Sequence, residues 1–323
     1  MSTTSNISKT IAFLFPGQGS QAVGMGRELC EQFPVARAVF EEADEALAFS
    51  ISRLCFDGPE EELRLTEHTQ PAILTVSVAA LRVLAERGVT GQFAAGHSLG
   101  EYSAHVAAGT LSFADAVRTV RNRGRYMQEA VPAGVGAMAA ILGMTVEAMV
   151  EACADAARES GGVVAAANMN APEQTVISGA AAAVELAAAK CKERGAKRAI
   201  PLKVSAPFHC ALMQPAQDQL AIDLQATTFH NPKIRVVSNA DASWVATGDE
   251  ARDALIRQVT GAVRWVECEQ QLIAAGATHF IEVGPGKVLC GLMRPLASSR
   301  TCLNVENVAS LDKTLAALEN NSG

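Results

Sequence analysis

The sequence predicts an α/β fold in which a small subdomain interrupts a larger core. Short apolar segments alternate with helical patterns toward both ends of the chain, which is typical of a mostly parallel sheet covered on both faces. Between these segments, strands and helices follow the order βαββαβ, the ferredoxin-like pattern. The chain has 323 residues, 49% of them hydrophobic, so it is long enough to form two structural units.

The larger core is expected to begin with a strand at Thr10–Phe15, which the Pro16-Gly17 turn ends. A second strand at Phe93–Ala95 leads into a glycine-rich turn. Helices are expected at Arg27–Ala48, Pro71–Arg87, Leu99–Ala108 and Ser112–Ala130. Later in the chain, the core resumes with strands at Ile234–Ser238 and His279–Val283 and helices at Asp249–Gln258 and Val266–Ala275.

The inserted subdomain is expected at residues 133–204, which leaves residues 1–132 and 205–323 for the core. Its first helix has a threonine cap at Thr145, and its second helix stops at Gly195. Its strands are expected at Gly136–Leu142, Val163–Ala167, Thr175–Ser178 and Lys197–Val204, and its helices at Thr145–Arg158 and Ala180–Arg194.

Composition narrows the class of protein. The formal net charge of −7 argues against a general nucleic-acid binder. No apolar run reaches about 18 residues, so no membrane association is expected. Eight cysteines without a C-x-x-C pair suit reduced thiols better than a disulfide framework or a zinc site. Because the N-terminal segment MSTTSNISKT also lacks the features of a signal peptide, we expect a cytoplasmic globular protein.

The segment GHSLG, Gly96 to Gly100, places a serine where an apolar strand turns into an alanine-rich helix. It fits the G-x-S-x-G pattern of a nucleophile elbow, a strained turn that exposes a serine hydroxyl. Ser98 is then a candidate nucleophile, and elbow geometry makes the backbone N–H of Leu99 a donor to the oxyanion. The alternative is that Ser98 caps the helix between two turn glycines.

A serine nucleophile needs a base to take its proton. Of the six histidines, His209 is the best candidate because it follows a strand that breaks at Pro207, and α/β folds place active-site residues at strand ends. The alternative is a structural loop histidine. No acid is evident as a partner for the ring, so a backbone carbonyl is a candidate for orienting it.

A second oxyanion donor is expected from a loop that follows another strand. The segment FPGQGSQ fits, because Gly17 and Gly19 let the backbone approach a ligand closely at Gln18. The segment is not a dinucleotide fingerprint, and GPGKV at residues 284–288 is not a Walker loop.

One arginine of the helix expected at Ser112–Ala130 lies on its apolar face. Other arginines of that helix share a solvated face, whereas Arg123 points into the apolar arc of Phe113, Val120 and Met127. A guanidinium on an apolar face is costly unless it meets an anion. The alternatives are a buried structural salt bridge and a site that grips a substrate carboxylate with two hydrogen bonds.

Together these motifs resemble the malonyl-CoA:acyl carrier protein transacylases of bacterial fatty acid synthesis. The resemblance runs in order from about Thr10 to Leu318 and rests on FPGQGSQ, GHSLGEYSA, RNRGRYMQEAVP, APFHCALM and EVGPGKVL. It implies an α/β-hydrolase-like core interrupted by a ferredoxin-like subdomain. It also implies roles for six residues: the nucleophile Ser98, the base His209, the malonyl carboxylate anchor Arg123, the oxyanion donors Gln18 and Leu99, and Gln258, whose backbone carbonyl supports the histidine.

The implied reaction moves the malonyl group from malonyl-CoA to the phosphopantetheine thiol of an acyl carrier protein through a malonyl-Ser98 intermediate. Coenzyme A is a product, and no metal or redox cofactor is implied. We expect a monomer that serves fatty acid or polyketide synthesis. The nearest alternative is a serine thioesterase or esterase, with water as the acceptor, and an alternative of another class is a catalytically silent subunit that binds a carrier protein.

Phe208 departs from the commonest bacterial pattern, in which a small serine precedes the histidine. In the related acyltransferase domains of polyketide synthases, phenylalanine at this position is associated with selection of malonyl groups, and serine with selection of methylmalonyl groups. By its size, Phe208 is expected to narrow the acyl pocket.

Acyl carrier proteins are acidic, so a basic patch is expected near the active site. The densest cluster of basic residues lies at residues 190–198 and contains one acid, Glu193. Within this cluster, Lys197 and Arg198 are the expected contacts to coenzyme A or the carrier protein. The alternative for its helical members is a solvated helix end whose cations favour the C-terminal dipole. The cluster comprises Lys190, Lys192, Arg194, Lys197 and Arg198.

Overall fold

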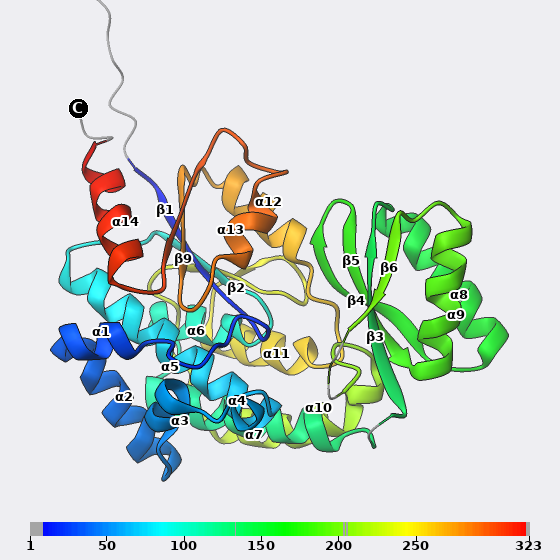
Figure 1. The fold of residues 1–323 in the computed structure, drawn as a ribbon, viewed down its shortest axis with the longest axis horizontal. Helices are drawn as coiled ribbons and strands as arrows, with labels where there is room; N and C mark the ends of the chain where they lie inside the picture. Colours follow the sequence, from blue (N-terminus) through cyan, green and yellow to red (C-terminus); the bar gives the residue numbers. More distant parts are fainter. Residues whose placement is uncertain (1–8, 133, 203, 205, 321–323) are drawn as a thin grey trace, which may run out of the picture.

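The computed structural model describes residues 9–132, 134–202, 204 and 206–320. Within them the chain forms a mixed α/β fold with a six-stranded and a four-stranded sheet, each packed against its own helices (Figure 1). Among the described helices, none combines the length and the apolar character needed to cross a bilayer.

The six-stranded sheet carries the larger part of the fold. Its strands lie in the order β10-β9-β1-β2-β7-β8, and every neighbouring pair is parallel except β7 with β8. The central strands β1 and β2 are buried on both faces, which explains why their sequences are continuous apolar segments. The strands are β1 (Ile11–Phe15), β2 (Phe93–Gly96), β7 (Arg235–Val237), β8 (Trp244–Val245), β9 (His279–Val283) and β10 (Thr301–Val305).

Helices cover both faces of this sheet. They are α1 (Arg27–Gln32), α2 (Pro34–Leu47), α3 (Ile51–Asp57), α4 (Glu60–Leu63), α5 (Thr66–Glu86), α6 (Gly100–Ala107), α7 (Phe113–Glu129), α10 (Gln214–Ala226), α11 (Gly248–Gln258), α12 (Trp265–Ala274), α13 (Val288–Met293) and α14 (Val308–Asn320), with a 3₁₀ turn η1 (Ala211–Met213). Side chains of β1 alternate between two cores. Phe13 and Phe15 share one core with α5 and α7, whereas Ala12 and Leu14 share the other with α12 and α13.

The four-stranded sheet is antiparallel and has the strand order β4-β5-β3-β6. Its two helices pack on one face, where the small side chains of Ala152 and Ala187 meet Ile141 in a separate core. From the same sheet, Met138 and Val176 reach into the core of the larger sheet. The elements are β3 (Gly136–Leu142), α8 (Val146–Ser160), β4 (Val164–Ala171), β5 (Gln174–Ala180), α9 (Ala181–Glu193) and β6 (Arg198–Pro201).

Hydrogen bonds join the two parts of the fold beside the end of β2. The Met169 N–H donates to the Val263 carbonyl at 2.9 Å, and the Val263 N–H donates to the Ala167 carbonyl at 2.8 Å. Close to them, His97 Nε2 and Asn170 Oδ1 lie 2.8 Å apart. These contacts hold β4 against the loops at the carboxyl ends of the parallel strands, where α/β folds place their active sites.

The elements that the sequence predicts occur in the predicted order, but several boundaries differ and some elements were not predicted. The helix expected at Arg27–Ala48 is two helices that meet at Phe33, because Pro34 has no N–H to continue the first. The strand expected at Lys197–Val204 spans only β6. The sequence did not predict α3, α4, α13, α14, β8 or β10. Both of these strands lie at sheet edges, where apolar patterning is weak.

Candidate active site

The turn between β2 and α6 holds Ser98 at a φ of 52°. A Cβ atom on Gly96 would lie 1.9 Å from backbone atoms of Gly100, and one on Gly100 would lie 2.2 Å from the Phe15 carbonyl oxygen. Because glycine has no Cβ atom, it is the only residue that fits at these two positions, and it allows the chain to turn this sharply. A serine in the left-handed region is strained, and strain at this position is characteristic of a nucleophile elbow.

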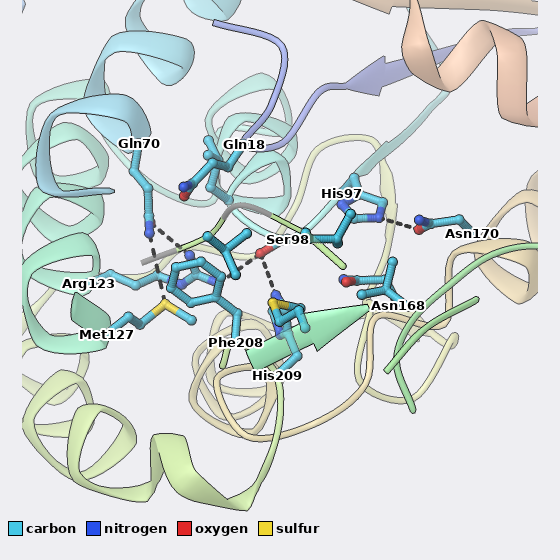
Figure 2. A pocket seen from close by; sticks show the side chains of 15 residues that line it. Gln18, Gln70, His97, Ser98, Arg123, Met127, Asn168, Asn170, Phe208 and His209 are labelled. Carbon is cyan, nitrogen blue, oxygen red and sulfur yellow. Dashed lines mark hydrogen bonds between the residues drawn. The ribbon is translucent and has the colours of Figure 1, made fainter. Parts of the chain in front are cut away.

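Ser98 does not cap α6. Its Oγ lies 2.7 Å from His209 Nε2 and accepts a hydrogen bond from Arg123 Nη2 at 3.0 Å (Figure 2). The N-cap residue of α6 is Leu99, and no side chain caps the helix. The interpretation of Ser98 as a helix cap is therefore wrong. Its hydroxyl faces His209 and Arg123, the candidate base and the candidate carboxylate anchor.

His209 lies in the loop before η1, with a positive φ of 59°. Its Nδ1 lies 2.9 Å from the backbone carbonyl oxygen of Gln258, at the end of α11. A carbonyl oxygen only accepts hydrogen bonds, so we assign the ring proton to Nδ1, which leaves Nε2 to accept the Ser98 hydroxyl proton. The structure thus brings together the serine, the histidine and the carbonyl named from the sequence.

Burial lowers the pKa of His209 to about 3, and the positive charge of Arg123 acts in the same direction. The side chain is only 4% exposed, so water offers the imidazolium little stabilisation. The ring is therefore neutral near pH 7, which is the form that accepts a proton.

Arg123 extends from α7 to Ser98 and is 1% exposed (Figure 2). Its Nη1 donates to Gln70 Oε1 at 2.7 Å, and its Nη2 also donates to Gln258 Oε1 at 2.9 Å. Within the described part of the chain, no carboxylate pairs with Arg123, and its buried Nε has no hydrogen-bond partner. The salt-bridge interpretation finds no partner there, and the guanidinium is suited to a substrate anion.

The backbone N–H groups of Gln18 and Leu99 are the candidate oxyanion donors. Both residues line the same cavity as Ser98. Gly17 permits the close approach of the two loops, because a Cβ there would lie 2.6 Å from the His97 carbonyl oxygen. Neither N–H donates to an acceptor among the described residues, so both remain open to a ligand.

A cavity of about 230 Å³ opens over Ser98. Its walls come from both parts of the fold, and Phe208, next to His209, lies on them as expected (Figure 2). The apolar lining is Leu99, Met127, Met138, Val176, Leu202, Val204 and Phe208, and the polar lining is Gln18, Gln70, His97, Ser98, Arg123, Asn168, Asn170 and His209.

The structure does not bring Lys197 and Arg198 to this cavity, since neither is among its described lining residues. Arg198 pairs with Leu142 across β6 and β3, whereas Met138 of β3 lines the cavity. Four residues of a strand span about 13 Å. Any contact that they make with a ligand is therefore outside the cavity itself.

The basic cluster is also not opposed by Glu193 alone, which corrects the expectation from the sequence. Three of its members pair with acids that lie far away in the chain but close in the fold, so its local positive field is weaker than its composition suggests. The ion pairs are Lys190–Glu159 at 2.7 Å, Lys197–Glu173 at 3.4 Å, and Arg194–Asp155.

Three buried polar residues around Ser98 escaped the sequence analysis. Asn239 Oδ1 accepts the Ser98 N–H at 2.7 Å, and Glu101 Oε2 accepts the Asn239 N–H at 3.0 Å. Gln70 is the third, as a partner of Arg123. Glu101 carries the same signal as Arg123, a charge within an apolar helix, whereas uncharged amides give no such signal.

A sequence model of the acyl transferase domain family matches residues 12–317. A protein of Bacillus subtilis (strain 168) named malonyl CoA-acyl carrier protein transacylase is 51% identical, over 96% of this chain and 97% of the relative. One of Escherichia coli (strain K12) with the same name is 48% identical, over 95% and 98%. This chain belongs to the malonyl CoA-acyl carrier protein transacylase family. The resemblance drawn from the motifs is confirmed.

Solved structures of the family share the fold. An acyl carrier protein S-malonyltransferase from Vibrio cholerae matches with a TM-score of 0.92 and 50% identity, covering 95% of this chain and 100% of the other. A malonyl-transacylase solved in complex with its type II PKS acyl-carrier protein also has a TM-score of 0.92, at 45% identity, covering 97% and 100%.

We expect Gly100→Ala to lower the free energy of unfolding by about 1–3 kcal/mol, because the added methyl group has no room beside Phe15. Denaturant unfolding measures the change. Gly291→Ala is the matched control, since a Cβ on that helical glycine meets nothing within 4 Å. Coinciding midpoints for the two variants would contradict the steric account of the elbow.

The lowered pKa of His209 predicts how Ser98 reactivity depends on pH. Because the neutral ring is the active base and persists down toward its pKa of about 3, labelling of Ser98 by phenylmethanesulfonyl fluoride should stay level between about pH 5 and pH 8. This uncharged reagent adds no titration of its own. An acid limb with a midpoint near about 6.5, the ordinary histidine value, would refute the assignment.

Proposed function

We infer that this chain transfers the malonyl group of malonyl-CoA to the phosphopantetheine thiol of an acyl carrier protein. The observation that carries the inference is the buried Arg123 guanidinium, whose Nη2 lies 3.0 Å from Ser98 Oγ without a carboxylate partner among the described residues. A group that binds carboxylates thus stands beside the reacting atom, so the preferred acyl group carries a free carboxylate. The names of the relatives agree with this substrate.

In the first half-reaction, His209 Nε2 takes the hydroxyl proton as Ser98 Oγ attacks the thioester carbon of malonyl-CoA. The N–H groups of Gln18 and Leu99 stabilise the oxyanion of the tetrahedral intermediate. The C–S bond then breaks, coenzyme A leaves with the proton from His209, and the malonyl group remains as an ester of Ser98. Arg123 holds the malonyl carboxylate throughout.

In the second half-reaction, the phosphopantetheine thiol takes the place of coenzyme A. His209 accepts the thiol proton, the sulfur attacks the ester carbon, and Ser98 Oγ leaves and recovers its proton from His209. Both halves are acyl transfers between oxygen and sulfur with no net oxidation, so the proposed mechanism uses neither a metal nor a redox cofactor.

A serine thioesterase or esterase would use the same Ser98 and His209 with water as the acceptor. It would have no use for a buried cation beside the nucleophile, and the presence of Arg123 therefore favours transfer of an acidic acyl group. A catalytically silent binding subunit would not need the 2.7 Å contact between Ser98 Oγ and His209 Nε2.

For the architecture, we propose an α/β-hydrolase-like core at residues 1–132 and 205–323 and a ferredoxin-like insert at residues 133–204. The elbow after β2 of a mostly parallel sheet supports the core assignment. The order βαββαβ and the antiparallel strand order β4-β5-β3-β6 support the insert. Residues 1–8, 133, 203, 205 and 321–323 of these ranges lie outside the described residues.

The proposed setting is bacterial fatty acid synthesis in the cytoplasm, with a monomeric enzyme, and polyketide synthesis is the alternative pathway. The family member solved with its carrier protein supports an acyl carrier protein as the partner. Lys197 and Arg198 remain candidate contacts to coenzyme A or the carrier protein. Phe208, on the cavity wall, is proposed to limit the volume above the α-carbon of the acyl group.

Intact-protein mass spectrometry tests the function. Wild type should gain the mass of one malonyl group after mixing with malonyl-CoA and lose it when carrier protein with its phosphopantetheine arm is added. Ser98→Ala should gain no mass. Ser103→Ala, which removes a buried hydroxyl of α6 that has no hydrogen-bond partner among the described residues, should load normally. A lasting adduct on another residue, or none on wild type, would exclude the mechanism.

Arg123→Ala should reduce kcat/KM for malonyl loading by about 10²–10³-fold, because it removes two hydrogen bonds to the carboxylate and each bond to a charged group contributes about 1.5–3 kcal/mol. Loading from acetyl-CoA, which has no carboxylate to anchor, should fall much less. Arg118→Ala is the matched control on the exposed face of the same helix. Equal losses with both substrates would show that Arg123 is only structural.

A further inference from the structure

We propose that the side chain of Gln258 is a positioning residue that sets the preference for acidic acyl groups, by holding the Arg123 guanidinium in place for the substrate carboxylate. The family resemblance implies only a backbone role for Gln258, toward His209. The inference rests on the proposed function, because the anchored group is the malonyl carboxylate.

The hydrogen bonds of the Gln258 amide allow only one orientation. Its Nε2 donates to the Ser98 carbonyl at 3.0 Å and to Glu101 Oε2 at 2.7 Å. Its Oε1 accepts from Arg123 Nη2 at 2.9 Å. The Ser98 carbonyl only accepts, Glu101 Oε2 already accepts the Asn239 N–H, and the guanidinium only donates. A flipped amide would therefore face oxygen with oxygen and N–H with N–H. Gln258 is fully buried, and water cannot replace these contacts.

Glu101 stabilises this orientation of the Gln258 amide on the side opposite Arg123. Its carboxylate is fully buried, and Oε2 accepts both the Gln258 Nε2–H and the Asn239 N–H. His105 Nε2 lies 3.9 Å from Glu101 Oε1, but burial lowers the pKa of His105 to about 4, so its ring is neutral near pH 7. Burial raises the pKa of Glu101 to about 7, and Arg123, on the far side of the Gln258 amide, is the positive charge that favours its ionised form.

This arrangement gives Arg123 a neutral hydrogen-bond partner at Gln258 and places the Glu101 carboxyl group beyond that amide. A carboxylate in direct contact would form a two-point pair with the guanidinium and compete with the substrate. Of the five guanidinium N–H groups, one on Nη1 donates to Gln70 and the two on Nη2 donate to Ser98 and Gln258. The second Nη1 N–H and the Nε–H have no acceptor among the described residues. The anchor is thus held in place while it remains able to bind an anion.

The side chain and the backbone of Gln258 serve different partners, so they can be tested separately. Replacing the side chain leaves the carbonyl that accepts from His209 Nδ1 at 2.9 Å. The base should therefore keep its orientation, while Arg123 and the Ser98 carbonyl each lose one contact. The expected defect lies in the choice of acyl group rather than in proton transfer.

The test measures Ser98 loading from malonyl-CoA and from acetyl-CoA in wild type and in Gln258→Met, which keeps the length of the side chain without its amide. We expect the malonyl-to-acetyl ratio of kcat/KM to fall by about 10–100-fold, since small misplacements of a positioning group have effects of this size. Labelling by phenylmethanesulfonyl fluoride, which needs Ser98 and His209 but no carboxylate anchor, should fall less than malonyl loading does. A loss that comes from the Ser98 carbonyl contact lowers loading from both acyl substrates alike and leaves their ratio unchanged.

Gln217→Met is the matched control, because Gln217 also makes a side-chain hydrogen bond, to Thr260, but does not line the cavity. Gln258→Asn keeps the amide but retracts it, and it should shift the ratio in the same direction if Gln258→Met fails to fold. A ratio equal to that of wild type in a folded Gln258 variant overturns this inference alone. Absence of a malonyl adduct on wild type overturns the proposed function instead.

Discussion

The site is organised around a buried positive charge. Arg123 lies beside the nucleophile oxygen with no carboxylate partner among the described residues, and such a cation is costly unless polar groups surround it. Gln70 and Gln258 supply carbonyl oxygens to it, and Glu101 lies one amide farther away. The same charge helps to keep His209 neutral. One guanidinium thus bears on the selection of the acyl group and on the protonation state of the base.

A second constraint is the sharp turn at Ser98. Gly96 and Gly100 are pressed against each other and against Phe15, so the serine has little freedom to relax from its left-handed conformation. Asn239 accepts the Ser98 N–H and the Gln258 amide donates to the Ser98 carbonyl, so both sides of the residue are held. Backbone strain persists only where the surroundings over-determine it, and they do so here.

The smaller sheet completes the cavity. Met138 and Val176 supply apolar walls from it, while Asn168 and Asn170 bring amide groups from β4. The backbone bonds between β4 and Val263 set the position of these side chains relative to Ser98. The acyl pocket is therefore a property of both parts of the fold together. Its shape depends on their contact as much as on the side chains of either part.

Local patterns in the sequence determined most of the strands and helices, the elbow around Ser98 and the family, because these depend on neighbours in the chain. The same patterns identified Arg123, since an isolated charge on an apolar helix face is visible without a structure. They did not reveal the partners of that charge. Gln70 and the Gln258 side chain contact Arg123 only across large separations in the chain, as Asn239 contacts Ser98, and neutral amides have no pattern of their own. The acids that pair with the basic cluster were hidden for the same reason. Contacts between distant segments, which only the folded chain creates, decided which charges are balanced and which remain open to a ligand.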